Sequence, residues 1–193
     1  MKNSNFKLYI MLAALVAINI VVAEEAYSTH YYTGHRWLFS TINVCYDSYS
    51  LKNVNIDGST NQFSKVASEL DQGRASWNNL PSQFTLNRVS SCNNWVTGEY
   101  HNTDWLGKVV SQYQFGYIVD ADMIINTKYN FKTAPECNGS TYGYTLDYVA
   151  RHEWGHYVEF NDYPFTVMHP SYDCNRWNGI DSHTSSSVSN IYG

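Results

Sequence analysis

Residues 151–162 read Arg-His-Glu-Trp-Gly-His-Tyr-Val-Glu-Phe-Asn-Asp. Residues four apart stand on one face of an α-helix, so His152 and His156 can direct two imidazole nitrogens at one metal ion. Glu153 lies beside them, where a carboxylate can accept a proton from a water molecule. The stretch therefore predicts a helix that carries a metal site.

The arrangement His-Glu-x-x-His is typical of zinc peptidases. Two histidines bind zinc too weakly for a catalytic site, so a third protein ligand is required and a fourth position is left for water. Glu159 is one candidate, because it stands seven residues beyond His152 on the same helix face. The remaining histidines without a partner at ligand spacing are interpreted as surface or loop residues: His30, His35, His101 and His183.

Three helices are predicted from apolar residues that recur at spacings of three and four. The metal-binding helix runs from about Thr145 to Phe160. An earlier and longer helix, from about Asn61 to Asn79, is ended by Pro81 and is expected to pack its apolar face on the core. A short closing helix spans Ser182 to Tyr192, with Ser182 as its N-cap.

Alternating apolar and polar residues predict strands. They cover residues 42–46, 84–89, 95–100, 105–113 and 117–126, and the polar segments 47–60, 128–143 and 161–179 are predicted to be loops. Strands around one long helix, followed by a strand and a second helix, indicate an α/β or α+β sandwich. No repeat or long linker divides residues 24–193, which are expected to form a single domain.

The first 23 residues have the organisation of a secretory signal peptide. Lys2 and Lys7 give a positive start, residues 8–22 are almost uninterrupted apolar, and residues 21–23 offer a small-residue cleavage site before Glu24. An uncleaved membrane anchor is the alternative, but the run is short for a spanning helix and no basic flank follows it. We therefore expect a secreted, extracellular protein with no membrane contact after cleavage.

The net charge of the remaining chain limits the classes of molecule that it is expected to bind. Beyond residue 23 it keeps 10 Lys and Arg against 17 Asp and Glu, a formal charge of −7. Nucleic acid and anionic membranes are therefore unsuitable partners. The 17 Tyr, 6 Trp and 8 Phe of the whole chain, with 15% charged residues, indicate a folded protein rather than a disordered one.

Four cysteines lie beyond the signal segment, and an even number in an exported protein predicts two disulfides. Three pairings are possible. Cys45 with Cys92 and Cys137 with Cys174 are favoured, because the first pair would join two early elements and the second would clamp the segments that flank the metal-binding helix. A cysteine zinc site is the competing interpretation, and it is disfavoured because no two cysteines are close in sequence.

Two longer patterns extend the motif. The run from His152 to Asp162 resembles the metzincin clan of zinc endopeptidases, whose motif HExxHxxGxxH ends in Asp in some members. Residues 167–172, Val-Met-His-Pro-Ser-Tyr, look like the matrixin form of the Met-turn, MxPxY. The resemblance implies that Asp162 is the third zinc ligand. It assigns the floor of the metal site and the wall of the substrate pocket to Met168, Pro170 and Tyr172, with His169 at a variable position.

The same resemblance covers roughly the last 75 residues, because residues 121–126 are similar to a central strand of the family and residues 188–193 to its closing helix. It implies a mixed, mostly parallel, twisted sheet of about five strands. A long first helix, an active-site helix and a short C-terminal helix complete the expected fold. One catalytic Zn²⁺ ion, a protein or peptide substrate and a monomeric state are expected with it.

Three features depart from the family. Glu159 stands where the motif has a glycine that turns with positive φ, a conformation that is unfavourable for a side chain. Either the turn is made differently, or Glu159 approaches the metal in place of Asp162. The gap from Asp162 to Met168 is shorter than is usual in matrixins. The segment that builds the family's second, structural zinc site is not visible, so one zinc ion is predicted and calcium is left open.

The expected activity is zinc-dependent hydrolysis of peptide bonds, with Glu153 as the general base that takes a proton from water and passes it to the leaving amine. The peptide is expected to add as a strand to an exposed sheet edge, for which residues 106–110 are the candidate. An inactive, zinc-stabilised binding module on the same fold is the alternative. A third reading is a disulfide-braced secreted protein with a chance motif. Glu153 argues against the inactive module, because a structural site has no use for a general base.

Overall fold

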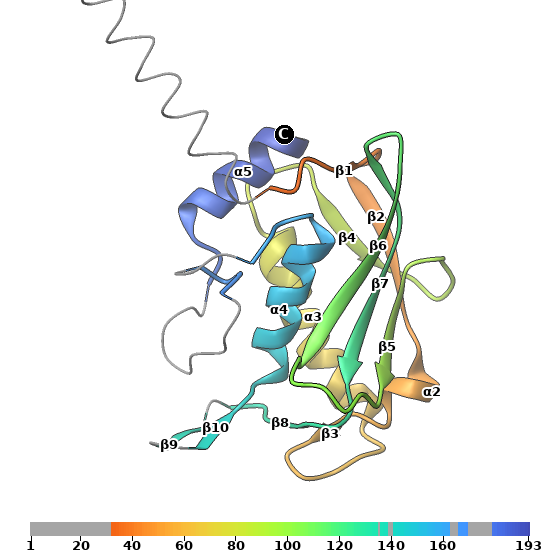
Figure 1. Ribbon diagram of the computed structural model, residues 1–193, viewed down its shortest axis with the longest axis vertical. Coiled ribbons are helices and arrows are strands. Elements are labelled where there is room, and N and C mark those ends of the chain that lie inside the picture. Colours follow the sequence, from red (N-terminus) through yellow and green to blue (C-terminus); the bar gives the residue numbers. More distant parts are fainter. Residues whose placement is uncertain (1–31, 135, 139–140, 163–165, 170–178) are drawn as a thin grey trace, which may run out of the picture.

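A six-stranded sheet forms one layer of the molecule, and the two long helices lie together on one of its faces (Figure 1). The computed structural model describes residues 32–134, 136–138, 141–162, 166–169 and 179–193. The strands of this sheet are β1 (Arg36–Trp37), β2 (Thr41–Tyr46), β4 (Thr85–Arg88), β5 (Trp95–Glu99), β6 (Gly107–Gln114) and β7 (Tyr117–Asn126). The helices are α2 (Ser48–Leu51), α3 (Phe63–Asn78), α4 (Leu146–Tyr157) and α5 (Ser182–Tyr192). The predicted α+β fold class is confirmed.

Strand β7 organises the sheet. On one side it pairs with β6 in antiparallel register, and on the other it pairs in parallel with β1 near its start and β5 near its end. The sheet continues in parallel from β5 to β2 and from β2 to β4. It is mixed and mostly parallel, as predicted, with six strands instead of about five. Strands β6 and β4 form its two long edges.

The sequence of β7 accounts for its place in the sheet. Ala121, Met123 and Ile125 alternate with more exposed residues and are buried in the core, as the period of a strand requires. Phe115 and Gly116, between β6 and β7, both have positive φ, 52° and 82°. Two such residues make the tight turn whose twist matches that of a hairpin. Strand β6 is therefore folded directly back along β7.

Helices α3 and α4 cross at very short distance. A Cβ atom on Gly73 of α3 would lie 2.7 Å from the backbone nitrogen of Arg151, so only glycine allows this approach. Two tryptophans bind the helices to each other, each donating from its indole Nε1 to a backbone carbonyl of the other helix. Trp77 donates to Arg151 over 2.8 Å and Trp154 donates to Leu70 over 3.2 Å. The helix that carries the motif is thus fixed to the core through its buried face.

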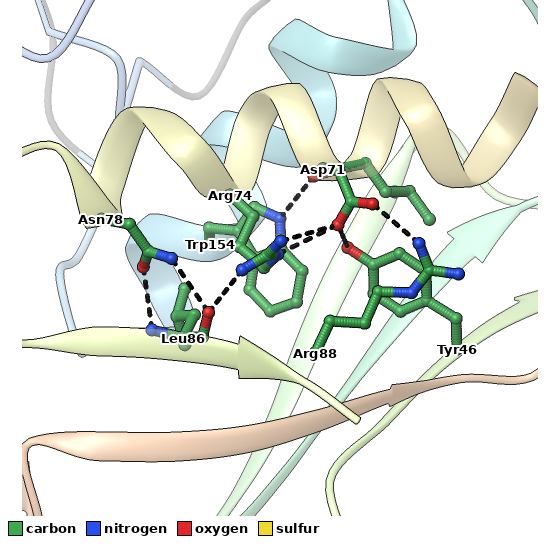
Figure 2. A network of polar contacts seen from close by, with 8 residues as sticks. Tyr46, Asp71, Arg74, Asn78, Leu86, Arg88 and Trp154 are labelled. Atoms are coloured by element: carbon green, nitrogen blue, oxygen red, sulfur yellow. Dashed lines mark hydrogen bonds and ion pairs between the residues drawn. The ribbon is translucent and has the colours of Figure 1, made fainter. Parts of the chain in front are cut away.

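A polar network holds β4 against α3 (Figure 2). The side chain of Asn78 takes both backbone groups of Leu86: its Nδ2 donates to the carbonyl over 3.0 Å, and its Oδ1 accepts from the amide over 2.8 Å. Arg74 donates to the same carbonyl. Asp71 pairs with Arg74 and with Arg88 at 3.0 and 2.7 Å. These contacts connect the outer strand of the sheet to the helix layer.

Both long helices are shorter than predicted, for reasons that the backbone makes clear. Asn61 has a φ of 61° and therefore lies outside α3, which starts at Phe63. Glu159 has a φ of 75°, so α4 cannot extend to Phe160. The predicted N-cap of α5 is wrong. Asp181 caps the helix, because its carboxylate accepts from the amide and the hydroxyl of Thr184, and Ser182 is the first helical residue.

Two of the predicted loops contain regular structure. Residues 47–60 hold α2 and the short strand β3 (Asn55–Ile56), which pairs with β8 (Asn130–Phe131). Residues 128–143 hold β8 and the hairpin of β9 (Glu136–Asn138) and β10 (Thr141–Gly143). Strands of two or three residues have no detectable periodicity. They form because a distant segment pairs with them, which a local pattern cannot reveal.

The Cys45–Cys92 disulfide is present, as predicted. The second predicted disulfide, Cys137 with Cys174, lies outside the described part of the structure, because Cys174 is not among the described residues. The predicted signal peptide, residues 1–23, also falls outside them. Within the described ranges, none of the helices is both long and apolar enough to cross a membrane.

Candidate metal centre

Three side chains converge at the C-terminal half of α4. His152 Nε2 and His156 Nε2 are 3.1 Å apart, and Asp162 Oδ1 lies 3.2 Å from each of them. We call these three atoms the ligand triangle. In the described part of the chain, no other group of three His, Cys, Asp or Glu residues could hold a metal ion. The structure thus brings together the two motif histidines and the acid that the family resemblance assigns to the site.

The histidines are oriented by their backbone partners. His152 Nδ1 is 2.9 Å from the carbonyl of Val167, and His156 Nδ1 is 2.8 Å from the carbonyl of Phe160. A carbonyl can only accept, so each Nδ1 carries the proton and donates it. Each Nε2 then presents a lone pair to the triangle. Backbone carbonyls on the far nitrogens are the usual support of metal-binding histidines.

The ligand triangle has the size that a zinc ion requires. Ligand atoms at about 2.0–2.1 Å from a tetrahedral zinc ion stand about 3.3 Å from one another, close to the separations found here. Two imidazole lone pairs and a carboxylate oxygen at such distances repel one another unless a cation lies between them. The residues present therefore fit zinc, with the fourth direction open to the cavity described below.

The electrostatics of the three residues agree with a shared cation. In the metal-free protein, hydrogen bonds from histidines protonated at Nε2 hold the pKa of Asp162 far below its usual range. Burial disfavours the charged form of His156, yet the hydrogen bond to Asp162 and the negative charge of Glu153 outweigh burial and raise the pKa of His156.

The turn after α4 delivers Asp162. The amide of Phe160 donates to the carbonyl of Gly155, and the amide of Glu159 donates to the carbonyl of His156, the two bonds of a Schellman motif. Glu159 occupies the left-handed position that a glycine usually fills, with a φ of 75°. The turn predicted from the family pattern is therefore made here with a glutamate.

Glu159 does not face the ligand triangle. Its carboxylate accepts from Thr33 Oγ1 over 2.6 Å and from the Tyr113 hydroxyl over 3.1 and 3.2 Å. The side chain is 3% exposed, so these donors occupy it fully. Of the two candidates for a third ligand, only Asp162 reaches the histidines in this structure.

Glu153 lies in the wall of the same site. It is buried, and within the described residues its Oε2 has no hydrogen-bond partner. Gly107, at the start of β6, lies directly against it: a Cβ on this glycine would stand 2.8 Å from Glu153 Cγ. Burial raises the pKa of Glu153, against the opposing charges of His152 and His156. A buried carboxylate with an unpartnered oxygen beside the ligand triangle is a candidate for accepting a proton from water.

Met168 lies in a tight turn beneath α4. The amide of His169 donates to the carbonyl of Thr166, which closes the turn, and the side chain of Met168 is fully buried. A Cβ on Gly155 would collide with the sulfur of Met168, so the turn and the helix are in close contact. Val167, from the same turn, supplies the carbonyl that orients His152. The other two predicted Met-turn residues, Pro170 and Tyr172, lie outside the described residues.

A cavity of about 670 Å³ opens over the site. Its lining includes the three residues of the ligand triangle and Glu153, together with Gly107, Val109 and Ser111 of β6. Further residues line the same cavity: Thr33, Trp105, Leu106, Tyr113, Tyr144, Tyr148 and His169. Of the histidines predicted to be non-ligands, His35, His101 and His183 lie outside the ligand triangle, and His30 is outside the described residues.

Several residues of the site were not predicted. Asn126 ends β7 with a fully buried amide, which accepts from the amides of His101 and Lys128 and donates to the carbonyl of Trp105. It thereby holds the segment that leads into β6 and the cavity. The one available signal was a polar residue at the end of an apolar run. Gly107 and Thr33 offered no signal, because their partners are distant in sequence.

No protein-family model matches this sequence, and no curated protein matches it as a relative. The resemblance to metzincins is therefore carried by the motif residues alone.

Proposed function

We propose that this chain is a secreted zinc-dependent endopeptidase, similar to the matrixin-like metzincins, that acts on proteins or peptides as a monomer. The observation that carries the proposal is the convergence of His152, His156 and Asp162 on one point beside the buried carboxylate of Glu153. Ligands for zinc and a candidate general base meet on the floor of one open cavity. This combination is what metal-assisted hydrolysis requires.

Strand β6 offers a place for the peptide. The carbonyl of Leu106 accepts from the amide of Asn126 on β7. Residues of an antiparallel strand alternate between facing their partner and facing away from it, so the backbone groups of Gly107, Val109 and Ser111 face away from β7. All three line the cavity. A peptide paired with them as an added strand would pass directly over Glu153, which Gly107 contacts.

The residues divide the chemistry among them. His152, His156 and Asp162 would hold one zinc ion, which when bound supplies the Lewis acidity that activates water and polarises a carbonyl. Glu153 accepts a proton from the water as its oxygen bonds to the scissile carbonyl carbon. It then gives that proton to the nitrogen as the C–N bond breaks. The products are a carboxylic acid and an amine, and Glu153 returns to its starting state.

The alternative is an inactive, zinc-stabilised extracellular binding module on the same fold. Such a module would gain nothing from a buried carboxylate with an unpaired oxygen, because an unsatisfied buried acceptor lowers stability. The endopeptidase is therefore the better supported of the two. The disulfide between Cys45 and Cys92 is in keeping with an oxidising compartment and with secretion.

The proposal is tested by expressing the full chain, collecting the protein from the medium, sequencing its N-terminus and measuring zinc content and casein cleavage. We expect an N-terminus at Glu24, one zinc per chain, and cleavage that is lost in Glu153→Gln although zinc is retained. Glu69→Gln is the matched control, since Glu69 is also a buried glutamate but lies on α3. Equal cleavage by wild type and Glu153→Gln would refute the enzyme, and zinc without any cleavage would favour the binding module.

A further inference from the structure

In the turn after α4, Glu159 adopts a backbone conformation that is unfavourable for a residue with a side chain. Its φ of 75° belongs to the left-handed region, where glycine is the favoured residue. The chain nevertheless keeps a long acidic side chain at this position and buries it. Glycine would meet the conformational requirement at lower cost, so the contacts of the carboxylate are the place to look for what the glutamate contributes.

The contacts of the carboxylate come from two segments that are far away in sequence. Thr33 belongs to the N-terminal strap, which we define as residues 32–37, and its hydroxyl lies 2.6 Å from Glu159 Oε2. Tyr113 belongs to β6, and its hydroxyl donates to both oxygens. Burial, together with the charge of Glu159, raises the pKa of Tyr113, so the phenol stays protonated as a donor. Glu159 therefore joins three separate parts of the fold.

The N-terminal strap follows the end of α4 closely. The amide of Thr33 donates to the carbonyl of Glu159, Tyr32 pairs with Phe160, and Trp37 Nε1 donates to the carbonyl of Tyr157 over 2.8 Å. The ring of His35 lies 4.4 Å from that of Tyr113, so the strap also contacts β6. The helix end is thus held between the strap on one side and β6 on the other.

The held turn leads straight to the metal ligands. Phe160, directly after Glu159, supplies the carbonyl that orients His156, and Asp162 follows two residues later. Any shift of Glu159 would change both the direction of His156 Nε2 and the place of Asp162 Oδ1. Two of the three atoms of the ligand triangle depend on this one turn.

We propose that Glu159 is a positioning residue: by anchoring the turn to Thr33 and Tyr113, its carboxylate holds His156 and Asp162 in zinc-binding geometry and couples that geometry to strand β6. The coupling to strand β6 rests on the proposed function, because β6 is where the peptide is proposed to pair. Tyr113 lies in the cavity wall near the end of this strand. Seating a peptide along β6 then tightens the contact that fixes the ligand turn.

Glu159→Gly separates this role from a purely conformational one. Glycine suits the backbone better, so a purely conformational role predicts zinc binding at least as tight as that of the wild type. The positioning role predicts a zinc dissociation constant about 10- to 100-fold higher, the usual effect of removing a group that orients a metal ligand. Asn61→Gly is the matched control, because Asn61 also has positive φ and is exposed, and it should leave zinc affinity unchanged.

The experiment is a double-mutant cycle in the full secreted chain, with zinc affinity measured by chelator competition and folding checked by circular dichroism. Tyr113→Phe should weaken zinc binding in the wild-type background and should have little further effect after Glu159→Gly. The thermal unfolding midpoints of the same variants, measured without metal, should also be non-additive: Tyr113→Phe should lower the midpoint of the wild type and have little further effect after Glu159→Gly. Unchanged affinity in Glu159→Gly, or equal effects of Tyr113→Phe in both backgrounds, would overturn the inference.

Kinetics distinguish this inference from the proposed function. If the wild type binds zinc but cleaves nothing, the proposed endopeptidase function is wrong. The role of Glu159 in zinc binding is then still decided by the double-mutant cycle. If cleavage is present, Tyr113→Phe at saturating zinc should raise KM more than it lowers kcat, because the peptide loses its coupling to the ligand turn. An unchanged KM would remove the proposed link to β6. A wild type that binds no zinc would overturn the positioning role along with the metal site.

Discussion

The main chain of Gly107 lies against the carboxylate of Glu153, so closely that a Cβ on the glycine would stand 2.9 Å from Oε1 and 3.0 Å from Cδ. Gly107 does not have positive φ, so it is needed for space and not for its backbone conformation. The first residue of β6 therefore determines where the proposed general base can rest.

Gly107→Ala should displace the Glu153 carboxylate without preventing folding, because a flexible side chain can move away from the new methyl group. We expect zinc affinity to stay unchanged and peptide cleavage to fall by about 10-fold or more, in the range that a misplaced acid–base group costs. Cleavage and zinc binding measured on the same preparations would test this. Gly179→Ala is the control, since a Cβ on Gly179 meets no atom within 4 Å. A fully active Gly107→Ala enzyme would contradict the contact's importance.

The raised pKa of Glu153 makes the stability of the metal-free protein depend on pH. The unfolded chain loses this proton near the ordinary value of 4.5, whereas the folded protein keeps it to higher pH. Between the two pKa values the folded state binds more protons, so the free energy of unfolding falls as pH rises through this window. Glu153→Gln cannot ionise and should be more stable than wild type at pH 7, by roughly 1–3 kcal/mol.

The measurement is urea unfolding in the presence of EDTA from pH 4 to pH 7.5. The advantage of Glu153→Gln should shrink as pH falls and vanish below about 4.5, where the wild-type side chain is protonated in both states. A constant difference over the whole range would mean that the substitution acts through packing and not through the charge.

Asp162→Ala should weaken zinc binding more than any Glu159 variant, because it removes one atom of the ligand triangle. We expect a loss that exceeds the about 10- to 100-fold typical of residues that only orient a ligand. Isothermal titration with zinc would measure it. Asp104→Ala serves as control, because Asp104 lines the same cavity but is not in the triangle. If Glu159→Ala proved the more damaging, the choice of third ligand would have to be reversed.

Gly155→Ala should destabilise the protein through the Met168 turn. The added methyl group would collide with the Met168 sulfur and lie 2.8 Å from Trp77 Cζ2, in a part of the core where all neighbours are buried. Overpacking of this kind costs about 1–3 kcal/mol. Thermal unfolding would show a lower midpoint, and zinc affinity should fall as well because the turn orients His152 through Val167. A normal midpoint would show that the turn can move freely from the helix.

The parts of the fold that follow from local pattern were predictable. Strand β7 has the predicted bounds, Tyr117–Asn126, because its alternation is uninterrupted. The apolar spacing of residues 145–160 predicts helix α4, and the favoured cysteine pairing agrees with the observed Cys45–Cys92 bond. The strand and the helix are predictable because their patterns involve residues that are close in sequence. The disulfide is predictable because four cysteines allow only three pairings.

The contacts that support the candidate metal site could not be predicted in the same way. Thr33 reaches Glu159 across 126 positions, and Gly107 reaches Glu153 across a fold that brings an edge strand over a helix. Helical spacing puts Glu159 on the face of His152, and this makes it a candidate ligand in the sequence. The positive φ that ends α4 turns the side chain away from that face. Helical spacing assumes that the helix continues through residue 159. The backbone turn at this residue is the reason that Glu159 does not face the histidines.

The capture of Leu86 by Asn78 has a consequence for how copies of this protein meet. Stacking of sheets into a polymer requires two open edges on every copy, one to receive and one to offer. On β4 the outward amide and carbonyl of Leu86 are already occupied by a side chain of the same molecule. On the other side of the sheet, β6 pairs with β7 alone among the described strands. The two edges of the sheet therefore differ: a side chain of the same molecule already occupies part of the β4 edge, whereas β6 is the edge proposed to receive a peptide.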